Sequence, residues 1–163
     1  MTNNKERVAI VPGSFDPITN GHMAIISKAA EQYDKVFVAV MINSQKEYMF
    51  SLPQREEITR AACSGIDNVT VISSEGWLWE LARDLGACAI VKGYRNDVDL
   101  EYERNMAKFN EERYPYAKTV LIKSEDDLST LSSTLIRERI KKGEHIENLI
   151  PHGAIEIIKN IKK

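Results

Sequence analysis

Cysteine is scarce in this 163-residue chain, and neither sign of charge dominates it. The two cysteines, Cys63 and Cys88, stand apart from each other and form no Cys-x-x-Cys pair or other zinc-binding spacing. Two isolated cysteines are typical of reduced thiols, so we expect neither a disulfide framework nor a zinc site. A formal net charge of −2 excludes a nucleic-acid-binding protein that relies on bulk positive charge.

Long apolar runs are missing as well. No stretch approaches the ~20 apolar residues that a transmembrane helix needs, and residues 1–7 lack the apolar core of a secretory signal. We therefore expect a cytoplasmic protein that binds neither membrane nor nucleic acid. The hydrophobic residues, 43% of the chain, suffice for the core of one domain, and no linker or repeat divides residues 1–163.

Five apolar runs alternate with helix-periodic segments along the chain. The runs cover residues 8–11, 35–42, 69–72, 87–91 and 119–122, and most of them are continuous. Continuous apolar runs are typical of parallel strands that are covered on both faces. The alternation predicts an α/β fold, namely a single doubly wound, Rossmann-like domain with a five-stranded parallel sheet and helices on both faces.

The segment PGSFDPITNGH, residues 12–22, joins the first apolar run to the first helix-periodic stretch. Ligands of open α/β sheets bind at such junctions, beyond the carboxyl ends of the strands. The start of the helix offers unpaired N–H groups and a positive dipole end to an anion. Because Gly21 has no Cβ, a ligand can approach the backbone there, and His22 then points toward the same space.

Three further segments carry cations or hydroxyls at strand ends or helix starts. Residues 43–46 follow the second strand and include Lys46, residues 92–95 follow the fourth strand and include two cations, and residues 132–134 open a later helix with three consecutive hydroxyls. A helix cap needs only one hydroxyl, whereas three hydroxyls beside unpaired N–H groups also suit phosphates. Together the four segments predict a phosphate-binding crevice.

Residues 19–22, TNGH, resemble the T/H-x-G-H signature of the nucleotidyltransferase superfamily, and residues 131–138 are similar to its I-S-S-T/S-x-[IV]-[RK] signature. With the other two segments, nearly the whole chain resembles the phosphopantetheine adenylyltransferase family. The chain has Lys92 where that family usually has arginine, Ser14 where it often has threonine, and Leu128 where many members have an aromatic residue near the adenine.

This resemblance implies an adenylyltransferase that reversibly transfers AMP from ATP to 4'-phosphopantetheine, giving dephospho-coenzyme A and pyrophosphate in the penultimate step of coenzyme A biosynthesis. The acceptor phosphate is already largely ionised at neutral pH, and no serine has an evident partner base. We therefore expect direct in-line attack without a covalent enzyme intermediate. The resemblance also implies Mg²⁺ held mainly by ATP phosphates and water rather than by protein ligands, a homohexamer, and feedback binding of coenzyme A.

The resemblance further implies a role for each matching residue. His22 would be the catalytic residue and would stabilise the transition state. The residues that would bind phosphopantetheine are Ser14, Lys46, Leu78 and Lys92. The residues that would bind ATP are Ser14, Phe15, His22, Gly93, Tyr94, Arg95, Glu103, Leu128, Ser129, Thr130, Leu131, Ser132, Ser133 and Thr134.

Two other functions compete with this one. A transferase of the same fold could act on nicotinate mononucleotide or glycerol phosphate; the first motif alone does not distinguish it, although Lys46 and residues 132–134 argue against it. A protein of another class, a non-enzymatic ATP-binding sensor, would need neither a histidine beside the phosphates nor a second phosphate clamp at Lys46.

Overall fold

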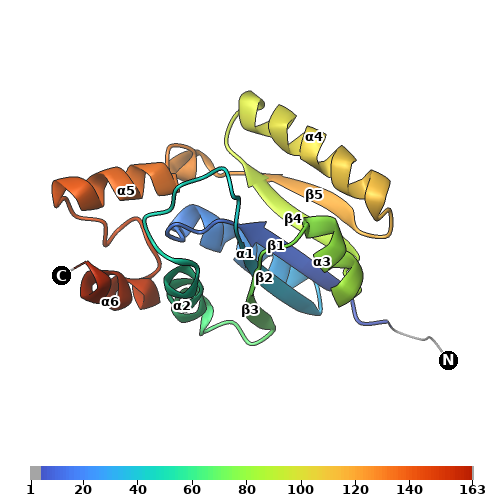
Figure 1. Ribbon diagram of the computed structural model, residues 1–163, viewed down its shortest axis with the longest axis horizontal. Coiled ribbons are helices and arrows are strands. Elements are labelled where there is room, and N and C mark those ends of the chain that lie inside the picture. Colours follow the sequence, from blue (N-terminus) through green and yellow to red (C-terminus); the bar gives the residue numbers. More distant parts are fainter. Residues whose placement is uncertain (1–4, 163) are drawn as a thin grey trace.

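The computed structural model describes residues 5–162 and contains one five-stranded parallel sheet (Figure 1). The strands are β1 (Val8–Gly13), β2 (Lys35–Met41), β3 (Val69–Ser74), β4 (Ala89–Tyr94) and β5 (Lys118–Lys123). Their order in the sheet is β3-β2-β1-β4-β5, and every neighbouring pair is parallel. Residues 1–4, most of the polar start of the chain, lie outside the described part. Within that part no helix combines the length and the apolar character needed to cross a membrane.

Helices connect the strands and form the carboxyl-terminal part of the chain. They are α1 (Asn20–Gln32), α2 (Leu52–Cys63), α3 (Leu78–Leu85), α4 (Asp97–Arg113), the short 3-10 helix η1 (Asp126–Leu128), α5 (Ser133–Lys142) and α6 (His152–Ile161). Local chemistry sets several of their ends. The hydroxyl of Ser51 accepts the N–H of Gln54 at the start of α2, and Gly86 and Gly143 end α3 and α5 with φ values of 65° and 70°.

Alternate strand residues face two separate apolar layers. Helices α1 and α2 pack on the face that carries Val36, Val38 and Val71. Helix α3 packs on the opposite face, which carries Ile10 and Ile90, and α4 lies beside α3. Because both faces are covered, the strands are apolar on both sides, and the prediction of a doubly wound parallel sheet is confirmed.

The end of β4 differs from its predicted position. The apolar run predicted a strand over residues 87–91, whereas β4 spans Ala89–Tyr94 and pairs through Tyr94 with Lys123 of β5. The predicted strand ended at Val91 because the next two residues, Lys92 and Gly93, are not apolar. Lys92 and Gly93 therefore lie on the last part of a strand instead of in the loop after it, and their backbone is held by the sheet.

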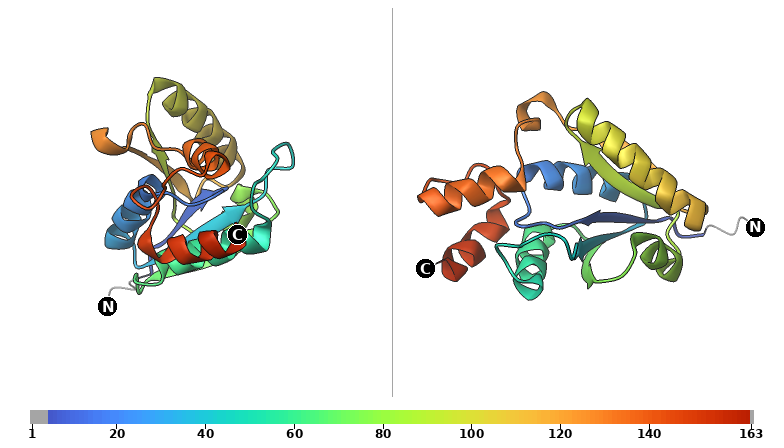
Figure 2. Two further views of the ribbon diagram at one scale, coloured as in Figure 1. Left: turned by 90° about the vertical axis from the view of Figure 1, so that its left-hand side faces the viewer. Right: turned by 45° about the horizontal axis from the view of Figure 1, so that its top comes forward.

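Helices α5 and α6 lie beyond the carboxyl ends of the strands, at the end of the molecule opposite the start of β1 (Figures 1 and 2). Helix α6 packs against α2. The N–H of Asn20 donates to the carbonyl oxygen of Leu149 at 3.0 Å, which joins the start of α1 to the segment before α6. The carboxyl-terminal part of the chain thus covers the carboxyl ends of the strands, where the predicted crevice lies.

Helix α6 approaches α2 so closely at Gly153 that no side chain fits there. A Cβ at this position would lie 2.5 Å from the carbonyl oxygen of Ala61, which belongs to helical backbone and cannot move aside easily. We expect Gly153→Ala to lower the free energy of unfolding by about 1–3 kcal/mol, the usual range for overpacking. Urea unfolding would measure the change.

Gly65→Ala is the matched control, because a Cβ at position 65 meets no heavy atom within 4 Å. We expect its free energy of unfolding to change by no more than about 0.5 kcal/mol. Equal stability of the two variants would show that the contact between α6 and α2 relaxes without loss.

Candidate active site

A cavity of about 570 Å³ lies at the carboxyl ends of the strands, beside β1 and β4. The chain continues from β1 toward one edge of the sheet and from β4 toward the other, and ligands of open α/β sheets bind at such a point. All four segments singled out in the sequence contribute to its walls. The predicted residues that line it are Ser14, Phe15, His22, Lys46, Leu78, Lys92, Gly93, Arg95, Glu103, Leu128, Leu131, Ser132 and Ser133. Segments separated by more than a hundred residues in the sequence therefore meet in one place.

Four predicted site residues are not part of the cavity wall: Tyr94, Ser129, Thr130 and Thr134. The hydroxyl of Ser129 donates to the carbonyl oxygen of Asp126 at 2.8 Å, and the hydroxyl of Thr134 accepts a hydrogen bond from Arg137 at 3.0 Å. Helix α5 turns by about 100° per residue, so consecutive hydroxyls at its start point in different directions. The cavity therefore receives Ser132 and Ser133, while Thr134 is exposed to solvent.

His22 is held by the residue that caps its own helix. The backbone N–H of Thr19 donates to His22 Nδ1 at 3.0 Å, and the backbone N–H of His22 donates to the Thr19 hydroxyl at 3.3 Å. Since Nδ1 is an acceptor in this arrangement, the proton of the neutral ring is on Nε2. The cap thus sets the tautomer of His22 and leaves Nε2–H as the donor side of the ring.

The pKa of His22 is lowered from 6.5 to about 4. The larger cause is burial, which disfavours the charged ring, and the smaller is the positive charge of Arg95. The imidazole is therefore neutral near pH 7. It can donate one hydrogen bond into the cavity, but it carries no positive charge of its own.

Phe15 supports His22 from the loop that follows β1. Its backbone has a φ of 47°, an uncommon conformation for a bulky residue, and its side chain is only 2% exposed. The ring meets the His22 ring edge-on, with 5.1 Å between the centroids. A Cβ on Gly13 would come within 2.9 Å of the Phe15 ring, so glycine at position 13 makes room for it.

The cations of the third segment are paired with carboxylates of α4. Lys92 Nζ lies 2.6 Å from Glu103 Oε2, and Arg95 Nε donates to Asp99 Oδ2 at 3.0 Å. The resemblance implies a nucleotide contact for Glu103, and the structure shows in addition that this carboxylate holds Lys92. Asp99 also lines the cavity and was not predicted, because its segment reads as an ordinary charged helix face.

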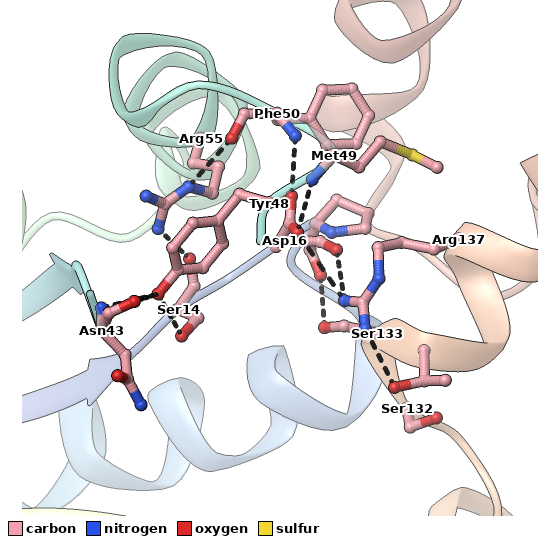
Figure 3. Close-up of polar contacts among 12 residues, drawn as sticks. Ser14, Asp16, Asn43, Tyr48, Met49, Phe50, Arg55, Ser132, Ser133 and Arg137 are labelled. Atoms are coloured by element: carbon pink, nitrogen blue, oxygen red, sulfur yellow. Dashed lines mark hydrogen bonds and ion pairs between the residues drawn. The ribbon is translucent and has the colours of Figure 1, made fainter. Parts of the chain in front are cut away.

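Buried polar residues behind the cavity wall connect its loops (Figure 3). The Asp16 carboxylate accepts the backbone N–H groups of Met49 and Phe50 at 2.9 and 3.0 Å, and Arg137 donates to the Asp16 carbonyl oxygen at 2.9 Å. The Ser133 hydroxyl donates to the carbonyl oxygen of Pro17 at 2.8 Å. The sequence does not reveal these contacts, since an isolated aspartate or arginine gives no signal of its distant partner.

We expect an NMR titration of the folded protein to show His22 protonating with a midpoint of about 4. The unfolded chain binds this proton near pH 6.5. Between these two values the unfolded state holds more protons than the folded state. The contribution of His22 to stability therefore falls as the pH drops from about 6.5 to about 4.

The positive charge of Arg95 is the smaller of the two causes that lower the pKa of His22, the larger being burial. Arg95→Gln removes this charge and should raise the pKa of His22 slightly. A His22 midpoint near 6.5 in the unaltered protein would contradict the lowering of its pKa by burial and by Arg95.

Comparison with known proteins places this site in a family. The model of the cytidylyltransferase-like family matches residues 10–139, which include all four segments. Among solved structures, a protein of Vibrio parahaemolyticus assigned as a nicotinate-nucleotide adenylyltransferase superposes with a TM-score of 0.73 over 97% of this chain and 94% of its own. The identity in that pair is 19%, so it supports the fold alone.

Curated relatives are more similar. The phosphopantetheine adenylyltransferase of Heliobacterium modesticaldum is 42% identical over 91% of this chain and 88% of its own length. That of Alkaliphilus oremlandii is 41% identical over 94% and 98%, and that of Shouchella clausii is 35% identical over 94% and 96%. The resemblance seen in the motifs thus extends along almost the whole of both chains. The chain belongs to the phosphopantetheine adenylyltransferase family and, with it, to the wider cytidylyltransferase-like family.

Proposed function

We propose that this protein transfers the adenylyl group of ATP to 4'-phosphopantetheine, releasing pyrophosphate and forming dephospho-coenzyme A. The choice of acceptor is supported by the relatives, which are named phosphopantetheine adenylyltransferases and are 35–42% identical to this chain. The observation that carries the reaction class is the neutral His22 donor, which shares one cavity with the Ser14 hydroxyl and the start of α5. Such a site can hold the phosphates of two anionic substrates side by side.

The reaction needs alignment and charge stabilisation more than proton transfer. An acceptor phosphate is already largely ionised at neutral pH, so its oxygen can attack the α-phosphorus of ATP without a general base. With its pKa at about 4, His22 is suited to donate a hydrogen bond from Nε2 and poorly suited to give up a proton. In this mechanism that donor stabilises the charge that grows on the α-phosphate oxygens in the transition state.

The acceptor phosphate would lie beyond the carboxyl ends of β1 and β4. Ser14, Lys46 and Lys92 line this part of the cavity, and Leu78 lines the wall where the pantetheine arm would extend. Lys92 is held by Glu103, but an ammonium group has three donors. It can therefore bind a phosphate oxygen while it keeps its carboxylate partner.

The ATP phosphates would lie at the start of α5. The Ser132 hydroxyl accepts the N–H of Leu135 at 3.1 Å, and the Ser133 hydroxyl donates a hydrogen bond to the carbonyl oxygen of Pro17. Both serine hydroxyls therefore shape the start of the helix. The N–H groups of its first turn and the positive end of its dipole supply the attraction for the β- and γ-phosphates.

Magnesium would reach this site with ATP. The carboxylates that line the cavity, Asp99 and Glu103, are each paired with a cation, and the described residues contain no group of three or more histidine, cysteine or acidic side chains able to hold a metal. This donor set fits an ion held mainly by phosphate oxygens and water. Bound in that way, Mg²⁺ would offset the charge of the phosphates. This chain's own residues orient the two substrates.

The family resemblance supports four further proposals for this chain, each open to direct measurement. They are a single nucleotidyltransferase domain over residues 1–163, assembly as a homohexamer, feedback binding of coenzyme A and a cytoplasmic location.

Pyrophosphate release from ATP and Mg²⁺ tests the proposed function directly. We expect release with 4'-phosphopantetheine and none with nicotinate mononucleotide or glycerol phosphate, because the phosphopantetheine adenylyltransferases match almost the whole length of the chain. Release with another acceptor would keep the reaction class and change the substrate. ATP binding without release for any acceptor would favour a nucleotide sensor.

His22→Ala should lower kcat at least ~100-fold and leave the KM values nearly unchanged, as expected for the loss of a donor that acts mainly in the transition state. Steady-state kinetics with both substrates would measure this. His145→Ala is the matched control, because the His145 side chain is 98% exposed and does not line the cavity. Near-normal turnover of His22→Ala would remove His22 from the mechanism.

A further inference from the structure

Tyr48 connects two loops of the cavity without lining it. It lies between Lys46 and the start of α2, and its side chain is partly buried, whereas residues 43–47 are exposed. Its hydroxyl accepts the backbone N–H of Asn43 at 2.7 Å and lies 3.5 Å from the hydroxyl of Ser14 (Figure 3). One phenol thus contacts the segment after β1 and the segment after β2.

The buried guanidinium of Arg55 fixes the ring of Tyr48 in place. Arg55 is 1% exposed, and its guanidinium carbon lies 3.9 Å from the centroid of the Tyr48 ring. Arg55 Nη1 donates to the carbonyl oxygens of Ser14 and Met41 at 2.8 and 3.0 Å, and Nε donates to that of Phe50 at 3.2 Å. The face of the ring stabilises a buried cation that is otherwise bonded to neutral carbonyl groups.

The turn that carries Lys46 is built on Asn43. The Asn43 carbonyl oxygen accepts the N–H of Lys46 at 3.0 Å, and the Asn43 side-chain oxygen accepts the N–H of Gln45 at 3.0 Å. Tyr48 holds the remaining backbone group of this residue, its N–H. The hydroxyl of Tyr48 therefore anchors the turn that presents the Lys46 ammonium to the cavity.

The Tyr48 hydroxyl has two acceptors within reach of its proton. Its oxygen accepts the N–H of Asn43 at 2.7 Å, and its proton can go to the Asn43 carbonyl oxygen at 3.4 Å or to Ser14 Oγ at 3.5 Å. If Tyr48 donates to Ser14 Oγ, the Ser14 proton is left to point at a ligand oxygen. Tyr48 would then orient the Ser14 hydroxyl as a donor toward a phosphate.

We propose that Tyr48 is a positioning residue for the acceptor phosphate, acting through the Ser14 hydroxyl and through the turn that carries Lys46. This inference rests on the proposed function, because it assigns these two groups to the phosphate of the acceptor. It predicts a larger effect on the acceptor than on ATP. ATP would be affected only through Ser14, which the resemblance also assigns to it, and not through the turn that carries Lys46.

Tyr48→Phe keeps the ring over Arg55 and removes only the hydroxyl. We expect the KM for 4'-phosphopantetheine to rise about 3- to 10-fold, the effect of losing one or two hydrogen bonds, while the KM for ATP stays within about twofold. In a Ser14→Ala background the same substitution should have a smaller effect, since part of its action passes through Ser14. Hydrogen exchange of the Asn43 amide, measured by NMR, should become faster.

Tyr116→Phe is the matched control, because Tyr116 is 77% exposed and precedes β5 at the other end of the sheet. An unchanged KM for 4'-phosphopantetheine in Tyr48→Phe, or an equal rise for both substrates, would overturn the inference alone. Absence of phosphopantetheine-dependent pyrophosphate release from the unaltered protein would overturn the proposed function. In that case an unchanged exchange rate of the Asn43 amide would also refute the anchoring role of Tyr48.

Discussion

The pairing of β1 with β2 on one side and β4 on the other is the constraint on which the site depends. The chain leaves β1 toward one edge of the sheet and returns past it to build the other half, so the loops after β1 and β4 diverge. This divergence opens the cavity, and the same parallel pairing brings the carboxyl ends of the strands to its floor. The side chains at those ends therefore face one another.

Inside this frame, buried polar groups hold the loops that the sheet alone would leave mobile. Arg55 bonds to backbone carbonyls of three different segments, and Asp16 accepts two N–H groups from the segment before α2. Leaving any of these buried groups unpaired would cost about 1–3 kcal/mol, more for a charged one. The loop conformation and the burial of these charges therefore depend on each other.

Charge is arranged locally rather than across the molecule. A net charge of −2 offers no general attraction for phosphates, yet Lys46, Lys92 and Arg95 line one cavity. Glu103 and Asp99 hold two of these cations in place. Arg95 also helps to keep His22 neutral, so a cation that would attract a phosphate also favours the uncharged donor form of the histidine.

Much of this could be predicted from the sequence. The continuous apolar runs predicted the parallel sheet with both faces covered, because strands that are buried on both sides carry apolar residues at successive positions. The end of β4 was wrong because polar strand residues such as Lys92 do not show in an apolar pattern. The partnership of Lys92 with Glu103 was missed, since charge on a helix face does not indicate which cation it meets.

The sequence by itself determined the order of the elements, the doubly wound sheet and the segments that carry the site chemistry, because each of these depends on residues close together in the chain. Only the tertiary structure decided which hydroxyls of residues 132–134 face the cavity, which nitrogen of His22 bears the proton, and that Tyr48 and Arg55 join the first two loops. These features depend on contacts between residues far apart in the sequence. Packing and burial settle such contacts, and no local pattern records them.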